Sequence, residues 1–290
     1  MPLKGFTCPS NGEEPGRKNS LNYCIKKCSA PCVSPHVLES MYNLENKNPH
    51  KGKVISVSQL CGGCKRKVML ERTEDFYIEP DRKLPTFRGA MIHGVIEQAK
   101  TPRLKRAGWL IEEHMELPVK TQSGEWTLSA TLDSYDTIRE SLNDVKTLQE
   151  YAVGKMVTGK NKGKWSDHIS DAYVKQLNLY RYMGKQLKLF DAKHLRLQII
   201  GFGRMIFTGT DVKWGLKGRE ETYYLPDVPI LSDEEVESWI ETDGDKWFRI
   251  MYMGEKAPVV DEADKWLCKI CVFYKTKFCP NPEEERELGF

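Results

Sequence analysis

The stretch from Leu128 to Leu148, LSATLDSYDTIRESLNDVKTL, decides the fold that we expect for this chain. Apolar and polar residues alternate from Trp126 to Ile138 and again from Leu142 to Thr147, which predicts two strands. A short polar turn separates them, so the strands are expected to be neighbours in one sheet. The remaining motifs are interpreted by their position relative to this pair of strands.

Charged side chains lie within both predicted strands. Asp133 is in the first, and Asp144 and Lys146 lie two residues apart in the second, so these two side chains leave the same face. Two carboxylates suit a hard divalent cation, and a neighbouring ammonium suits the activation of water against a phosphodiester. The alternative is an ordinary pair of charges on the solvent face of a strand, because so short a motif often occurs by chance.

Composition indicates a globular protein. The chain has 290 residues, 40% hydrophobic and 29% charged, enough for one large domain or two smaller ones. It has no apolar run of about 18 residues and begins without a signal peptide, so neither a membrane span nor export is expected. The net charge of +3 does not by itself indicate nucleic-acid binding. Nine cysteines without an export signal favour an intracellular, reducing location such as the cytoplasm, the nucleoid or a host cell.

Residues 1–52 form a cysteine-rich extension. They are rich in Pro, Gly, Asn and Lys, and they hold Cys8, Cys24, Cys28 and Cys32. Four thiolates are the number that a closed structural zinc site needs, and His36 is an alternative ligand. The other interpretation is a set of reduced thiols without a metal.

Five more cysteines lie outside this extension. Cys61 and Cys64 form a Cys-x-x-Cys pair, which fits half a zinc site, a redox pair or one ligand of a larger cluster. The C-terminal segment holds Cys268, Cys271 and Cys279 among aromatic residues. Three thiolates need a fourth from elsewhere, and a set of four suits either zinc or a [4Fe-4S] cluster.

Two segments with helical spacing carry further polar side chains. In the first, residues 86–101, His93 and Glu97 share a face, and Gly89 and Gly94 suggest that something packs closely against the helix. In the second, residues 166–184, Gln176 and Tyr180 lie four apart and can reach one site. Other expected elements are a strand from Val54 followed by a helix capped by Ser58, strands at 109–120, 194–208 and 221–230, and a helix from 233 to about 253 capped by Ser232.

Taken in order, these motifs resemble the RecB-type branch of the PD-(D/E)XK nucleases. The matching residues are Gly89-x-x-x-His93, Asp133, Asp144-x-Lys146 and Gln176-x-x-x-Tyr180. One cysteine before the fold and three after it are similar to the iron-sulfur nucleases of that branch, which include CRISPR-associated Cas exonucleases and the AddB subunit of a bacterial recombination nuclease. The resemblance covers about residues 54–282.

The resemblance implies an α/β fold and an organisation into two regions. A restriction-endonuclease-like core with a central mixed sheet flanked by helices would occupy residues 53–290, with cluster ligands at both ends. The cysteine-rich extension would occupy residues 1–52, followed by this core and its C-terminal cluster-binding segment.

The resemblance also implies site residues and cofactors. The ligands of Mg²⁺ or Mn²⁺ would be His93, Asp133, Asp144 and the Val145 carbonyl. Lys146 would position or activate water and stabilise the transition state, and Gln176 and Tyr180 would orient the DNA strand and the lysine. A [4Fe-4S] cluster would be held by Cys64, Cys268, Cys271 and Cys279. Cys64 is preferred because the basic residues after it resemble the family's pattern, although Cys61 is a competing ligand.

The implied function is that of a metal-dependent DNA exonuclease acting at single-stranded ends. Such enzymes serve DNA processing, recombination or CRISPR spacer acquisition, alone or with a protein partner, and need no membrane. The alternative is a non-catalytic, metal-stabilised DNA-binding or adaptor module with a nuclease fold. The intact Asp144-x-Lys146 pair favours the enzyme.

Overall fold

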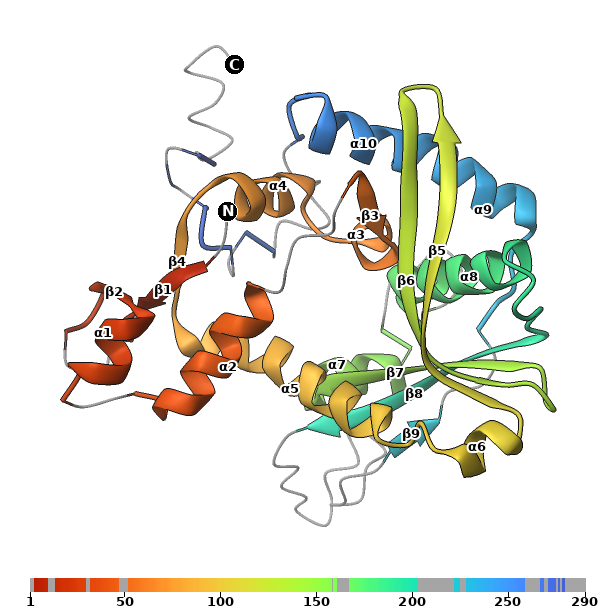
Figure 1. Cartoon of the computed structure of the whole chain (residues 1–290), viewed down its shortest axis with the longest axis horizontal. Helices are drawn as coiled ribbons and strands as arrows, with labels where there is room; N and C mark the ends of the chain where they lie inside the picture. The colour runs from red at the N-terminus through yellow and green to blue at the C-terminus, as the bar shows by residue number, and fades with distance from the viewer. Residues whose placement is uncertain are drawn as a thin grey trace. The chain divides into compact units, whose positions relative to one another are not determined.

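The chain forms two compact units (Figure 1). Unit 1 comprises Met1–Lys51, Gly63–Arg88 and Arg249–Phe290, and unit 2 comprises Gly52–Gly62 and Gly89–Phe248. The computed structural model describes residues 3–9, 14–29, 32–46, 52–157, 159–160, 167–202, 222–224, 228–258, 267–268, 271–274, 276 and 278–279. None of the described helices is long and apolar enough to cross a lipid bilayer.

A mixed sheet forms the centre of unit 2. Its strands follow the order β3-β6-β7-β8-β9, and β5 pairs with β6 in the long ribbon of Figure 1. β6 runs antiparallel to β7, whereas β7 runs parallel to β8. The strands are β3 (Val54–Ser56), β5 (Trp109–Thr121), β6 (Gly124–Asp136), β7 (Ser141–Gln149), β8 (His194–Phe202) and β9 (Thr222–Tyr224).

Helix α8 (Asp171–Gln186) packs on this sheet and lies against α3 and α9. Its Val174, Leu177 and Met183 are completely buried, as the apolar spacing of a core-facing helix requires. The remaining helices of unit 2 are α3 (Val57–Cys61), α6 (Pro102–Arg106), α7 (Glu150–Val157), α9 (Asp233–Trp239) and the π-helix η1 (Ile240–Gly244), while α5 (Pro80–Glu97) and α10 (Asp245–Tyr252) each have residues in both units. The predicted α/β class, a central mixed sheet flanked by helices, is confirmed.

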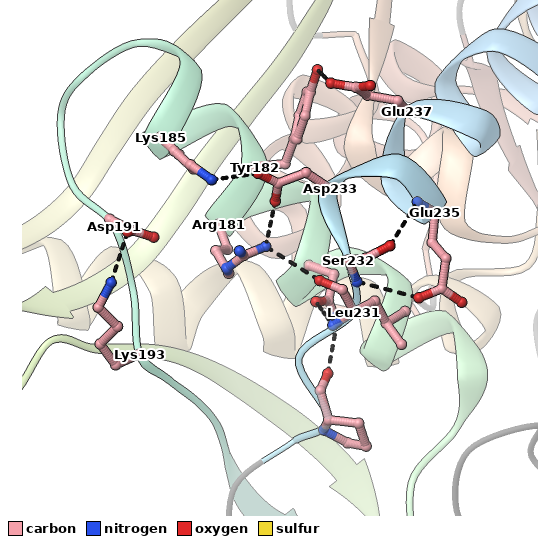
Figure 2. A network of polar contacts seen from close by, with 12 residues as sticks. Arg181, Tyr182, Lys185, Asp191, Lys193, Leu231, Ser232, Asp233, Glu235 and Glu237 are labelled. Atoms are coloured by element: carbon pink, nitrogen blue, oxygen red, sulfur yellow. Dashed lines mark hydrogen bonds and ion pairs between the residues drawn. The ribbon is translucent and has the colours of Figure 1, made fainter.

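A polar network joins α8 to α9 (Figure 2). Asp233, the first residue of α9, accepts from Arg181 Nη1 at 2.9 Å and from Lys185 Nζ at 2.5 Å. Tyr182 donates its hydroxyl to Glu237 Oε1 at 2.9 Å. These bonds connect charged groups from two helices, so they fix how α9 lies along α8.

The β6–β7 turn is fixed by a side chain of its own. Asp136 accepts backbone N–H bonds from Ile138 at 3.0 Å and Arg139 at 3.2 Å, so its carboxylate closes the turn. The paired residues of β6 and β7 run from Asp136 with Ser141, next to the turn, to Ser134 with Asn143. One residue further along each strand come the two aspartates predicted as metal ligands, so the turn sets their register.

Unit 1 is built on a three-stranded sheet of order β2-β1-β4. Its elements are β1 (Leu3–Thr7), β2 (Lys18–Ser20), α1 (Leu21–Lys26), α2 (Pro35–Glu45), α4 (Lys65–Thr73) and β4 (Phe76–Ile78). Gly5 is required in β1, because a Cβ there would collide with the carbonyl oxygen of Asn19 on β2. The apolar core comprises Leu3, Phe6, Leu38, Met41, Phe76, Ile78 and Phe273. Residues from the first and last parts of the described chain therefore share one core.

Two local predictions are wrong. Ser56, not Ser58, caps α3: its hydroxyl accepts from Gln59 N at 3.2 Å, and the Gln59 side chain accepts from Ser56 N at 3.0 Å. This reciprocal pair satisfies two backbone donors, which a cap at Ser58 would not do. The predicted close packing at Gly94 is also wrong, because an added Cβ would meet no atom of the described chain within 4 Å. At Gly89 the nearest such atom is Thr147 Oγ1 at 3.5 Å, an ordinary contact.

Several element boundaries differ from the predictions. The helix predicted from 233 to about 253 does begin with a capping box of Ser232 and Glu235, but it is divided into α9, η1 and α10. The π-helical segment places Gly244 against the Trp126 ring, where a Cβ would lie 2.7 Å from the nearest ring carbon. The helix predicted at 86–101 spans Pro80–Glu97, and the helix predicted at 166–184 begins at Asp171 in the described residues. Of the strand predicted at 221–230, Thr222–Tyr224 forms β9 and residues 228–230 are not in a strand, while 221 and 225–227 lie outside the described residues. The part of the predicted 194–208 strand beyond Phe202 also lies outside them.

Candidate active site

His93 and two carboxylates form the centre of the candidate site in unit 2. Helix α5 presents His93, whose Nδ1 lies 3.2 Å from Glu112 Oε1 and 3.3 Å from Asp133 Oδ1. All three ligand atoms fall within 4.8 Å of one another, and no other set of three His, Cys, Asp or Glu groups does so within the part of the chain that the structure describes. Nitrogen and oxygen donors so close together can hold one divalent cation.

The His93 ring carries a positive charge in this arrangement. Hydrogen bonds to Asp133 and to Glu112 raise its pKa from 6.5 to about 10. The imidazolium therefore neutralises part of the carboxylate charge. A metal ion placed between the three groups takes over that role, and it requires the neutral form of the ring.

Glu112 enters the site through an unusual backbone conformation. Its φ of 46° lies in the left-handed region, although Glu112 stands inside strand β5. The paired residues on either side, Ile111 with Ser134 and Glu113 with Leu132, keep one register, so no residue is inserted. Such a conformation costs of order 1–3 kcal/mol and occurs most often where function requires it. Here it accompanies a side chain turned toward His93.

Asp133 is held from the neighbouring strand. The backbone N–H of Val145 on β7 donates to Asp133 Oδ2 at 2.5 Å, while Oδ1 faces His93. Asp133 is only 4% exposed, so little water competes for its charge. The carboxylate is therefore fixed in orientation with one oxygen available to a ligand.

Asp144 and Lys146 form a buried ion pair beside this centre. Lys146 Nζ lies 2.9 Å from Asp144 Oδ1 and 2.7 Å from Oδ2, and Asp144 is 1% exposed. Oδ2 is buried and accepts no hydrogen bond, since the 2.7 Å contact is outside hydrogen-bonding geometry. Oδ2 therefore already faces one cationic group, the Lys146 ammonium.

Burial and charge act in opposite directions on this pair. Burial raises the pKa of Asp144 above its ordinary value against the opposing charge of Lys146, and the charge of Asp133 adds to the rise. Burial would lower the pKa of Lys146, but Asp144 more than offsets it, so that this pKa lies above its ordinary value. Lys146 is thus an ammonium, suited to stabilising negative charge rather than to accepting a proton.

Gln176 connects Asp144 to Tyr180 on helix α8. Its Nε2 lies 3.5 Å from Asp144 Oδ1 and donates to the Tyr180 hydroxyl at 2.6 Å. Burial raises the pKa of Tyr180 well above its ordinary value, so the phenol stays neutral. Gln176 and Tyr180, which were predicted to reach one site, therefore lie beside Asp144, the ion-pair partner of Lys146.

Cys61 lies in the neighbourhood of the Asp144–Lys146 pair. Burial raises the pKa of Cys61 to about 12, and the charges that act on it are those of Lys175, Lys146, Asp144 and Asp243. No cysteine is among the groups that perturb it most.

The four cysteines predicted to bind the [4Fe-4S] cluster all belong to unit 1: Cys64, Cys268, Cys271 and Cys279. Cys64 is the N-cap of α4, and Cys271 N donates to Cys268 O at 3.1 Å. Burial raises the pKa of Cys271 and of Cys279, and the charge of Cys64 adds to both rises. Cys279 also feels the charge of Cys268. The sulfur atoms are therefore near enough to affect one another's charge, but no three of them lie within 4.8 Å of one another.

The structure thus brings together most of the residues predicted from the sequence and adds one. Glu112 was missed because its strand shows only two adjacent glutamates, and nothing in that pattern predicts a left-handed residue. The helix partner expected for His93, Glu97, is exposed instead, because the carboxylates that His93 contacts come from the sheet.

Comparisons with known proteins give distant structural similarity alone. No protein-family model matches the chain, and no curated protein matches it. A solved structure named SSO0001 is 15% identical with a TM-score of 0.45, covering 82% of this chain and 92% of that chain. A solved structure from Eubacterium rectale, named "Putative exonuclease", is 14% identical with a TM-score of 0.43, covering 73% of this chain and 86% of that chain.

Proposed function

We propose that this protein is a divalent-metal-dependent deoxyribonuclease that hydrolyses phosphodiester bonds at single-stranded DNA ends. The observation that carries the proposal is the convergence of His93, Glu112 and Asp133 beside the buried Asp144–Lys146 pair. Hard donors for a cation next to an ammonium are the groups that hydrolysis of a phosphodiester requires. Exonuclease action and a role in recombination, DNA processing or CRISPR spacer acquisition follow from the family resemblance and belong to the same proposal.

The donor set fits Mg²⁺ or Mn²⁺. His93, Glu112 and Asp133 would hold the ion, with Asp144 and the Val145 carbonyl as further ligands. When bound, the ion supplies Lewis-acid activation of the phosphate and of the attacking water. Asp133 needs no rearrangement to take part, because the Val145 N–H already fixes its carboxylate.

The remaining polar side chains of the site would orient its groups and stabilise negative charge on the phosphate. Lys146, held as an ammonium by Asp144, would stabilise the negative charge that develops on the phosphate oxygens. Gln176 would orient both Asp144 and Tyr180, which leaves the Tyr180 hydroxyl proton for a contact with the DNA strand. A protein partner in DNA processing is compatible with this arrangement.

The second part of the proposal is a structural [4Fe-4S] cluster. Its ligands would be Cys64, Cys268, Cys271 and Cys279. Thiolates are soft and carboxylates are hard, so the two centres should select different metals. Joining Cys64 to the C-terminal cysteines closes about 200 residues, which should stabilise unit 1 by constraining the unfolded chain. Zinc is the rival metal: anaerobically purified protein should contain iron and acid-labile sulfide, and zinc alone at this site would contradict the cluster.

Cleavage assays with a matched pair of lysine variants test the enzyme. With Mn²⁺ and end-labelled single-stranded oligonucleotides, Lys146→Ala should lower the rate roughly 100-fold or more. Lys193→Ala is the control, because Lys193 is an exposed lysine whose ion pair is with Asp191. Equal background cleavage by wild type and Lys146→Ala would favour the non-catalytic DNA-binding or adaptor module. Rapid cutting of closed single-stranded circles would exclude a strict exonuclease, and the labelled end that shortens first gives the polarity.

A further inference from the structure

Lys146 has a second neighbour in unit 2 besides Asp144. Its Nζ lies over the aromatic ring of Tyr173, 5.7 Å from the ring centroid. An ammonium within about 6 Å of a tyrosine ring centroid is attracted by the negative face of the ring. The Lys146 side chain is 19% exposed and Tyr173 is partly buried, so water screens this contact only in part. A carboxylate and an aromatic ring therefore both hold the ammonium.

Tyr173 stands on the same face of α8 as two polar residues already assigned to the site. Gln176 and Tyr180 follow three and seven residues later, which is the spacing of a single helix face. The N–H of Tyr173 donates to Ser170 O at 2.9 Å, so Tyr173 lies in the first turn of the helix. The face of α8 that reaches Asp144 through Gln176 thus reaches Lys146 through Tyr173.

The carboxylate and the ring act differently on the ammonium. Asp144 carries a negative charge and offsets part of the positive charge of Lys146. Burial raises the pKa of Tyr173, so its phenol stays neutral. A neutral ring attracts the ammonium without cancelling its charge. That charge is what a lysine needs in order to stabilise the oxygens of a reacting phosphate.

The ring also holds Lys146 independently of the metal ligands. A lysine ammonium ends a flexible four-carbon stem, so its position depends on the groups that contact it. In the proposed function Asp144 is shared between Lys146 and the divalent ion. Tyr173 is not a metal ligand, so its contact with the ammonium does not compete with the ion.

We propose that Tyr173 is a positioning residue of the nuclease, whose ring holds the Lys146 ammonium where it meets the phosphate. The inference rests on the proposed function and adds a residue that lies outside the motifs of the family resemblance. The face of the ring matters and the hydroxyl does not, because the attraction of a cation comes from the π system. Tyr173 acts through Lys146 and not on the reacting atoms.

Helix α8 carries another lysine that is held in the same manner by different partners. Lys175 Nζ lies 5.0 Å from the Trp239 ring centroid and 3.7 Å from Asp243 Oδ2. Like Lys146, it is contacted by one ring and one carboxylate. Lys175→Met is therefore a matched control for Lys146→Met.

Fluorine NMR of the full-length protein labelled with 3-fluorotyrosine tests the contact without any cleavage. The Tyr173 resonance is the one missing from the spectrum of Tyr173→Phe. Lys146→Met removes the ammonium and keeps an unbranched stem, so it should shift this resonance, whereas Lys175→Met should leave it in place. An unmoved Tyr173 resonance in Lys146→Met would overturn the proposal, even if a variant of Tyr173 did not fold.

Cleavage kinetics with Mn²⁺ and single-stranded oligonucleotides test the positioning role. Tyr173→Leu has no ring and should lower kcat roughly 10-fold with KM unchanged, because a displaced ammonium stabilises the transition state less. Tyr173→Phe keeps the ring and should retain the kcat of wild type. An equal loss in both variants would assign the effect to the hydroxyl, and a change in KM alone would assign it to DNA binding; either result overturns the proposal.

Failure of this inference is distinguishable from failure of the proposed function. Equal background cleavage by wild type and Lys146→Ala would overturn the nuclease and, with it, the role of Tyr173. Metal-dependent cleavage that Lys146→Ala loses and Tyr173→Leu fully retains would overturn the role of Tyr173 alone.

Discussion

Val145 holds Asp133 by a backbone hydrogen bond of 2.5 Å that crosses from β7 to β6. Val145, which lies between Asp144 and Lys146, therefore positions a carboxylate through its backbone N–H and not through its side chain. Because β7 also carries Asp144 and Lys146, a single strand supplies the ion pair and fixes the carboxylate of its neighbour. The relative position of the two aspartates thus depends on sheet register rather than on flexible side chains.

Glu112→Gln should weaken metal binding. The substitution keeps the size of the side chain but removes its charge beside His93, so the Mn²⁺ concentration for half-maximal cleavage should rise roughly 10- to 100-fold. The maximal rate at saturating Mn²⁺ should change much less, because the side chain of Glu112 bonds to His93 and not to the catalytic Lys146.

Glu113→Gln is the matched control for this prediction. Glu113 is the next residue of β5 but pairs with Lys100, and its side chain is 39% exposed. Its Mn²⁺ dependence should equal that of wild type. Identical Mn²⁺ titrations of the two variants would show that Glu112 is not a ligand.

Metal binding should release a proton from His93. In the metal-free protein the pKa of His93 is about 10, above the ordinary 6.5, so the ring is charged at pH 8. Affinity for Mn²⁺ should therefore rise with pH by up to about tenfold per unit through this range. Calorimetry at pH 8 in two buffers of different ionisation enthalpy should give about one proton released per Mn²⁺, and His93→Gln should abolish this release.

The raised pKa of His93 also determines how the stability of the metal-free protein changes with pH. Because the folded-state pKa of His93 is raised, its pairing with Asp133 and Glu112 stabilises the fold fully below pH 6.5. That contribution decreases above pH 6.5 and is lost as the pH passes about 10. Wild type and His93→Gln should therefore differ most in free energy of unfolding at acidic to neutral pH.

Two helical glycines should respond in opposite ways to alanine. Gly94→Ala should stabilise α5 by about 0.5–1 kcal/mol, since the added methyl meets nothing in the described chain and alanine favours the helix. Gly184→Ala should cost about 1–3 kcal/mol, because its methyl would collide with the ring of Phe190. Urea denaturation of both variants measures the difference. A stabilised Gly184→Ala would mean that Phe190 is free to move.

Asp233→Asn should destabilise the protein at neutral pH. The hydrogen bond from Lys185 is the main cause that holds the pKa of Asp233 below its ordinary value, with the charge of Arg181 adding to it (Figure 2). A depressed pKa gives stability above the unfolded value of about 3.9 that is lost as the pH falls through the folded value. The expected loss at pH 7 is about 1–2 kcal/mol, and the two proteins should converge in acid.

Asp191→Asn is the comparison for Asp233→Asn. Asp191 also pairs with a lysine, Lys193, but both side chains are about half exposed. Solvent screens such a pair, so the variant should lose less than about 0.5 kcal/mol. Equal losses in the two variants would mean that burial of Asp233 by α8 and α9 contributes nothing.

The sheet strands and the side chains they carry were predictable because they depend on local patterns. Alternation marked β5, β6 and β7, and spacing of four residues joined Gln176 to Tyr180. The α/β class follows from these patterns and is confirmed. The ligand assignments for iron, zinc and magnesium stay predictions, because thiolates and carboxylates identify a class of metal and not one element.

What could not be predicted depends on contacts between distant segments. The left-handed Glu112 occurs within the pairing of β5 with β6, and the three-part α9–η1–α10 helix accompanies the close approach of Gly244 to Trp126. The cap at Ser56 was missed by two residues, since serine occurs at both positions and only the Gln59 contact distinguishes them.

The core of unit 1 has a consequence for how the protein is synthesised. Leu3 and Phe6 pack with Phe273 in a core whose other buried members are Leu38, Met41, Phe76 and Ile78, so this core is complete only after the segment around residue 273 has been synthesised. The residues of unit 2 between Gly89 and Phe248 emerge in between and can form their sheet first. A ribosome stalled before residue 273 would therefore carry a folded sheet domain and a core of unit 1 that still lacks Phe273.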